Sequence, residues 1–113
     1  MNYRDEVTRL FVNHVKPEDY LTMGALGLAG EAGEVIDLIK KHKFQGRELD
    51  RDKLINELGD VRWYIEVLLH AIQSDMAEVE NVNVTKLRRR YPNGFTTENS
   101  ILKLDQKTID NQK

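Results

Sequence analysis

The chain has 113 residues, of which 40% are hydrophobic and 32% charged, and its formal net charge is −2 at pH 7. This size predicts one domain with one modest core, and the small charge argues against a nucleic-acid or membrane-surface partner. The absence of cysteine excludes disulfides, thiolate metal ligands and a cysteine nucleophile. There is no apolar signal region at the N-terminus and no apolar run of roughly 18 residues, so we expect a soluble cytoplasmic protein.

Apolar residues recur at helical spacing through most of the chain, which predicts an all-α fold of four helices followed by a polar segment. The expected helices cover about 3–15, 20–43, 50–72, and from a cap at Ser74 or Asp75 to about 90. The second helix would bury Leu21, Ala25, Leu28, Ala32, Val35, Ile36 and Ile39. The third would bury Leu54, Leu58, Val61, Ile65, Leu68 and Ile72.

Two short segments carry turn signals. Phe44-Gln45-Gly46-Arg47 separates the second and third helices, and Gly46 can adopt a positive φ there. Tyr91-Pro92-Asn93-Gly94 would end the fourth helix, because proline and glycine stop helices. Beyond Phe95 we expect one short helix and a partly flexible tail over 96–113.

Four carboxylates lie symmetrically about the first of these turns. Glu31 and Glu34 are three residues apart, as are Glu57 and Asp60, so each pair shares one helix face. The midpoints of the two pairs are equally distant from the turn near Gly46. An antiparallel helical hairpin would therefore bring all four acids to the same height and to one side of the helix pair. Gathered carboxylates repel, and a divalent cation relieves that repulsion, which predicts a metal site.

A single Glu-x-x-Glu pair is common on solvated helices, where a basic residue four positions on usually relieves the repulsion. Here the residues at those four positions are Val35, Leu38, Val61 and Tyr64. None of these four residues is a cation, which favours the metal interpretation. All-oxygen ligands suit Mg²⁺ or Mn²⁺ rather than zinc or copper. Because Mg²⁺ usually completes its shell with water and phosphate oxygens, a phosphate ester or anhydride is the natural substrate.

Two other features leave alternatives open. Gly24, Gly27, Gly30 and Gly33 recur every third residue in the second helix, and indicate either close approach of a helix or substrate, or simple tolerance. Lys86 and the run Arg88 to Arg90 form a basic cluster. It either stabilises the helix C-terminus or supplies cations for substrate phosphates.

Together these motifs resemble the MazG-type nucleoside triphosphate pyrophosphohydrolases. Glu31-Ala-Gly-Glu34 and, after 22 residues, Glu57-Leu-Gly-Asp60 are similar to the Glu-x-x-Glu…Glu-x-x-Asp signature of that family. The stretch from Asn83 through Lys86 and Arg90 to Pro92 is similar to its Asn-x-x-Lys-Leu-x-x-Arg-Tyr-Pro segment. The resemblance covers about 20–95 and implies that 1–113 is a single domain of this type.

The resemblance implies a MazG-type helical bundle assembled as a homodimer or homotetramer. It implies Mg²⁺-dependent cleavage of a (d)NTP to a (d)NMP and pyrophosphate, in nucleotide pool sanitation or adjustment. Glu31, Glu34, Glu57 and Asp60 would hold the metal, and one glutamate, with Glu34 preferred, would activate water. Asn83, Lys86 and Arg90 would contact the phosphates.

Two points qualify the inference from the resemblance. Arg62 occupies a position where many relatives have an apolar residue, so packing there is expected to differ. The alternative function is a non-catalytic helical interaction or regulatory module with a vestigial metal site.

Overall fold

The computed structural model describes residues 1–103, and the predicted all-α fold is confirmed for them, since they form helices and no strand. The chain divides into two compact units, Met1–Ser74 and Asp75–Lys113. Among the described residues no helix is both long and apolar enough to cross a membrane. The expected flexible tail lies largely outside them, from residue 104 onward.

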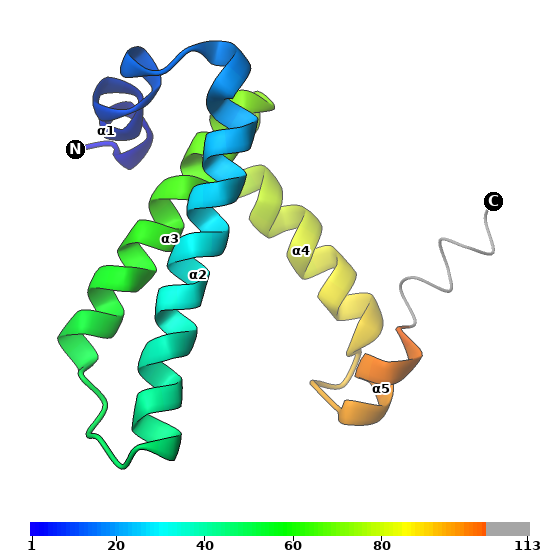
Figure 1. Cartoon of the computed structure of the whole chain (residues 1–113). Coiled ribbons are helices and arrows are strands. Elements are labelled where there is room, and N and C mark those ends of the chain that lie inside the picture. The colour runs from blue at the N-terminus through cyan, green and yellow to red at the C-terminus, as the bar shows by residue number, and fades with distance from the viewer. Residues whose placement is uncertain (104–113) are drawn as a thin grey trace. The chain divides into compact units, whose positions relative to one another are not determined.

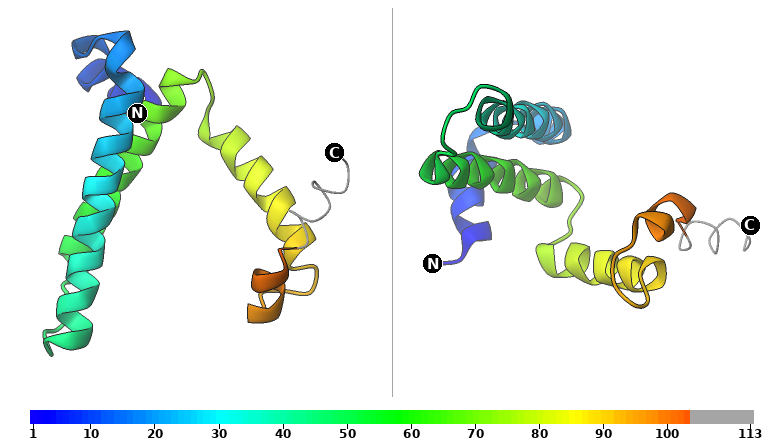
Figure 2. Two further views of the ribbon diagram at one scale, coloured as in Figure 1. Left: turned by 45° about the vertical axis from the view of Figure 1, so that its right-hand side comes forward. Right: turned by 90° about the horizontal axis from the view of Figure 1, so that it is seen from below.

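The first unit is built on a helical hairpin. Its elements are α1 (Tyr3–Leu10), two 3₁₀ turns (Val12–His14 and Pro17–Asp19), α2 (Tyr20–Phe44) and α3 (Arg51–Ala71). Figures 1 and 2 show α2 and α3 lying side by side and antiparallel along most of their length. Gly46 has a φ of +65°, so the predicted left-handed glycine in the connecting loop is confirmed.

The first helix is shorter than its pattern predicted. It ends at Leu10, and the chain continues as a 3₁₀ turn rather than as a helix to Val15. A tertiary contact accounts for the early end: the Tyr20 hydroxyl donates a 2.8 Å hydrogen bond to the carbonyl of the buried Val12. That bond holds the turn against the start of α2.

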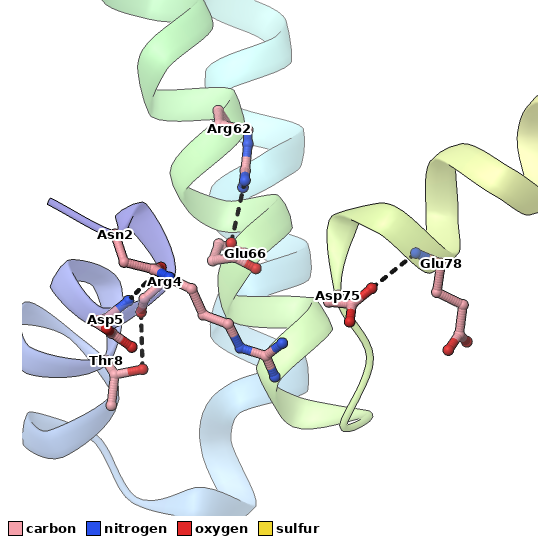
Figure 3. A network of polar contacts seen from close by, with 8 residues as sticks. All are labelled: Asn2, Arg4, Asp5, Thr8, Arg62, Glu66, Asp75 and Glu78. Atoms are coloured by element: carbon pink, nitrogen blue, oxygen red, sulfur yellow. Dashed lines mark hydrogen bonds and ion pairs between the residues drawn. The ribbon is translucent and has the colours of Figure 1, made fainter.

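Side-chain caps start α1, α3 and α4 at residues of the expected kind. Asn2 accepts a hydrogen bond from the N–H of Asp5, and Asp75 accepts one from Glu78 (Figure 3). Asp50 accepts one from the N–H of Lys53 at the start of α3. Of the two cap candidates for the fourth helix, the structure therefore uses Asp75 rather than Ser74.

Two glycines allow α2 and α3 to approach closely. A Cβ atom built on Gly27 would lie 2.2 Å from the Tyr64 ring, and one on Gly24 would lie 2.9 Å from Leu68. The close-approach interpretation is thus confirmed for these two glycines. By contrast, nothing lies within 4 Å of the equivalent positions at Gly30 and Gly33, which face open space in the described chain.

The predicted buried stripes were partly wrong. Leu21, Ala25, Ile36 and Ile39 on α2 are exposed, as are Leu58 and Ile72 on α3. The cause is the glycine contact: α2 presents Gly24 and Gly27 to α3, which turns much of its aliphatic surface outward. The buried hydrophobic residues among those described are instead Val7, Val12, Val67 and Leu69.

Aromatic rings and one ion pair complete the packing of α1 and its following turn on α3. The Phe11 ring meets Trp63 and Tyr64 edge to face, with centroids 6.1 and 6.4 Å apart. Glu66 is buried and accepts a 3.2 Å hydrogen bond from Arg62 (Figure 3). The Arg62 guanidinium also lies 4.6 Å from the centre of the Tyr3 ring. Arg62 thus contacts a carboxylate and an aromatic ring, at a position where an apolar residue was expected in many relatives.

The second unit contains α4 (Met76–Arg90) and the short α5 (Thr97–Leu102). The predicted turn between them is present: Gly94 has a φ of +97°, and the rings of Tyr91 and Phe95 lie 5.1 Å apart. Thr96 caps α5 by accepting a hydrogen bond from the N–H of Asn99.

Candidate metal centre

Three of the four predicted acids converge. Glu31 on α2 and Glu57 and Asp60 on α3 each offer a carboxylate oxygen, and these three oxygens all lie within 4.8 Å of one another. Glu31 and Glu57 are half-buried and Asp60 is exposed. The group therefore lies at the edge of the hairpin, with one side open to solvent.

The register of the hairpin explains the convergence. Gly27 lies against Tyr64, and their residue numbers total 91; Gly24 lies against Leu68 and Val67, with totals of 92 and 91. Glu31 with Asp60 also totals 91, as does Glu34 with Glu57. In an antiparallel helix pair, residues that lie opposite one another have nearly the same total. The glycine contacts therefore place Glu31 level with Asp60, and Glu57 lies one turn nearer the loop.

The carboxylates of the cluster repel one another. The pKa of Glu31 is raised above its ordinary value of 4.5, first by a side-chain hydrogen bond with Glu57 and then by partial burial. The negative charges of Asp60, Glu57 and Glu34 add to the effect. A divalent cation between these carboxylates would relieve the repulsion that contributes to the raised pKa.

Glu34 is placed differently from the other three. It is exposed and does not belong to the converging group, although its charge still acts on Glu31. Its predicted part in metal binding and water activation stays a prediction.

Within the described part of the chain, none of the acids of the cluster forms an ion pair. Within residues 1–103, the ion pairs involve other carboxylates: Glu6, Asp37, Asp52 and Glu66. The converging group also contains no histidine. Carboxylate oxygens that form no ion pair within residues 1–103 suit a hard divalent cation such as Mg²⁺ or Mn²⁺. The residues present therefore fit the group that the sequence predicted.

The three predicted phosphate ligands lie on α4 in the second unit. Asn83 and Lys86 are exposed and Arg90 is half-buried. Their spacing of three and four residues places them along one face of the helix. Their contact with phosphate stays a prediction.

Sequence reasoning missed one set of charged residues in the first unit. Lys41, His42, Arg47 and Lys53 surround a cavity at the loop end of the hairpin, where the sequence suggested only a helix C-terminus and a turn. The available signal was the position of Lys53, four residues before Glu57 and hence on the same face of α3.

The fold and the site together define a class: an all-α protein in which two facing helices hold a candidate cation site made of carboxylate oxygens. Within that class, the chain belongs to the MazG family: residues 20–95 match the MazG nucleotide pyrophosphohydrolase domain. The match covers the hairpin, α4 and the turn after it.

A curated relative is found in a bacteriophage. The chain is 38% identical over 79 residues to the Gene 37 protein of Mycobacterium phage L5, which covers 66% of this chain and 67% of the phage protein. No solved structure matches the chain significantly.

Proposed function

We propose that this protein is a Mg²⁺-dependent nucleoside triphosphate pyrophosphohydrolase that cleaves (d)NTPs to (d)NMPs and pyrophosphate. Membership of the MazG family supports the reaction class. The observation that carries the proposal is the convergence of Glu31, Glu57 and Asp60, none of which forms an ion pair within residues 1–103. The physiological purpose would be sanitation or adjustment of the nucleotide pool.

The chemistry requires little beyond positioning and charge neutralisation. Glu31, Glu57 and Asp60, with Glu34 beside them, would hold the cation, which supplies positive charge to the phosphate oxygens. One of the glutamates, with Glu34 preferred, would accept a proton from the attacking water. Asn83, Lys86 and Arg90 would bind phosphate oxygens through N–H donors.

The test is product analysis with a mixture of ribo- and deoxyribonucleoside triphosphates and Mg²⁺. Pyrophosphate with nucleoside monophosphates is the expected result. Glu57→Gln should abolish turnover, while Asp52→Asn, an exposed acid on the same helix outside the cluster, should leave it unchanged. Orthophosphate with diphosphates would refute the assigned scission. No turnover with any nucleotide would favour the non-catalytic helical module.

We also propose a homodimer or homotetramer. The core of one chain is small, and Leu26, Ile36 and Phe44 on α2 are 69, 65 and 79% exposed. An apolar cavity of about 420 Å³ lies on this helix, lined by Val35, Ile36, Ile39, Phe44 and the stems of two lysines. A second copy covering this face would bury the aliphatic surface that the glycine contacts turn outward.

Light scattering after size exclusion measures this assembly directly. Ile36→Glu should reduce the mass to that of one chain, because a buried unpaired carboxylate opposes association. Circular dichroism checks that the variant stays helical. A wild-type protein that is monomeric at every concentration would refute the assembly.

A further inference from the structure

A second charged site adjoins the carboxylate cluster. At the loop end of the hairpin a cavity of about 230 Å³ is lined by Leu38, Lys41, His42, Arg47, Glu48, Asp50 and Lys53. It is formed by the last turns of α2, the connecting loop and the first turn of α3. All of these residues belong to the first unit.

The charges around the cavity are unequally satisfied. Lys41 pairs with Asp37 at 2.7 Å, and Asp50 accepts the N–H of Lys53 at 3.0 Å as a helix cap. Arg47 and Lys53 form no ion pair with any residue in the range 1–103. One guanidinium and one ammonium group of the lining thus have no carboxylate partner within residues 1–103. Of the two acids in the lining, Glu48 neither forms an ion pair there nor caps a helix.

A neighbouring carboxylate responds to the excess positive charge. The pKa of Asp37 is held below its ordinary value, chiefly by its hydrogen bond with Lys41 and further by the charges of Lys41, Lys40 and Lys53. Lys53 is on α3 and Asp37 on α2, so the positive potential extends across the hairpin. The same potential favours any anion in the cavity.

His42 adds a further polar group with a defined tautomer. Its Nδ1 lies 2.8 Å from the Arg47 carbonyl oxygen, and because a carbonyl only accepts, Nδ1 carries the hydrogen. This bond ties the loop to the end of α2. It fixes the backbone from which the Arg47 side chain extends.

The cavity lies one helical turn from the acids. Leu38 follows Glu34 by four residues on α2, and Lys53 precedes Glu57 by four residues on α3. Four residues correspond to about 6 Å along a helix. A cation at the carboxylates and an anionic group in the cavity would therefore be neighbours along the hairpin.

The size of the cavity limits what it can hold. Sites that bury a drug-sized molecule measure roughly 300–1,000 Å³, and this cavity is smaller. With its charged lining, it suits a phosphate or pyrophosphate group rather than a nucleoside.

We infer that this cavity is a phosphate subsite that receives the distal phosphates of the triphosphate, with Arg47 and Lys53 as its principal donors. The guanidinium can bind two phosphate oxygens at once, and the ammonium adds a point charge. The subsite would retain the pyrophosphate portion while the cation lies at the carboxylates. The identity of the bound group rests on the proposed function, whereas the binding of a phosphate anion does not.

Calorimetric titration with inorganic pyrophosphate tests the subsite without turnover. The double variant Arg47→Gln/Lys53→Gln should lose about tenfold or more in affinity, since two charge-assisted hydrogen-bonding groups are removed. The matched control is Lys16→Gln/Arg51→Gln, which removes the same charges from exposed positions that do not line the cavity. It should bind pyrophosphate within about twofold of the wild type. All four positions are exposed, so both variants should fold, as circular dichroism would verify.

The outcomes separate this inference from the proposed function. Equal losses in both double variants, an unchanged affinity in the first, or no pyrophosphate binding by the wild type would each overturn the subsite. Competitive inhibition of triphosphate hydrolysis by pyrophosphate, weakened in the Arg47 and Lys53 variant, is expected if the distal phosphates occupy the cavity. If pyrophosphate binding depends on these two residues but the protein hydrolyses no nucleotide, the anion site stands and the proposed hydrolase activity is refuted.

Discussion

Gly27→Ala tests the hairpin contact on which the acidic cluster depends. The added Cβ would lie 2.2, 2.3 and 2.4 Å from three carbons of the Tyr64 ring. Carbon atoms in ordinary contact are about 3.5 Å apart or more, so the ring must withdraw by roughly 1 Å. It is packed edge to face against Phe11, and therefore has little freedom to withdraw without disturbing the turn after α1.

The magnitude follows from two opposing terms. Overpacking a close contact costs about 1–3 kcal/mol, and direct overlap with a packed ring places this case near the upper end. Replacing a helical glycine by alanine gains roughly 1 kcal/mol. Gly33→Ala gains the second term without the first, because nothing lies within 4 Å of its Cβ position. The difference between the two variants isolates the overlap, and should be about 2–3 kcal/mol in free energy of unfolding.

Urea denaturation measures that difference. The fluorescence of Trp63, the one tryptophan of the chain, reports on the hairpin because its ring contacts Phe11. Far-UV circular dichroism provides a second probe of the same transition. A Gly27→Ala protein as stable as Gly33→Ala would mean that α2 and α3 do not meet at these residues. That result would also contradict the helix register that places Glu31 opposite Asp60.

Three further predictions concern single groups. Arg62→Leu should destabilise the protein by about 2–4 kcal/mol in urea denaturation, because it leaves the buried Glu66 carboxylate unpaired. Adding Glu66→Leu should recover most of that loss. A double variant as unstable as Arg62→Leu alone would contradict this reasoning. Because the pKa of Glu31 is raised, the folded protein binds the proton of this carboxyl group more tightly than the unfolded chain does. The resulting contribution to stability should be fully present below pH 4.5 and be lost as the pH rises through the raised pKa. Denaturation midpoints measured in EDTA should show this loss, Mg²⁺ should reverse it above that range, and Glu31→Gln should remove the slope. Asp50→Ala should cost about 1 kcal/mol through loss of the α3 cap, and an unchanged midpoint would exclude a stabilising cap.

Much of the local structure could be predicted from short-range chemistry. The left-handed Gly46 and the cap of α4 depend on residues close in sequence; the glycine was predicted, and the cap was narrowed to Ser74 or Asp75. The symmetric positions of Glu31 and Asp60 about the turn were enough to place them at one height. These features require only helical periodicity and the reversal of the chain.

The rotation of the helices about their axes could not be predicted in the same way. An apolar stripe shows which side chains share a face, but not how closely the partner helix approaches that face. At Gly24 and Gly27 the missing side chains let α3 approach α2, and Ile36 and Ile39 were left exposed as a result. Charge could not be placed either, because the cavity around Arg47 and Lys53 forms only when the loop folds between two helix ends.

The sequence alone therefore determined the helices, the turn between them and the acids that the hairpin would bring level, because each depends on spacing along the chain. Only the tertiary structure decided which of those acids meet, which apolar side chains stay exposed and where the unpaired cations lie. The physical reason is that close packing at two glycines sets the distance and rotation between α2 and α3, and those quantities leave no periodic signal in the sequence.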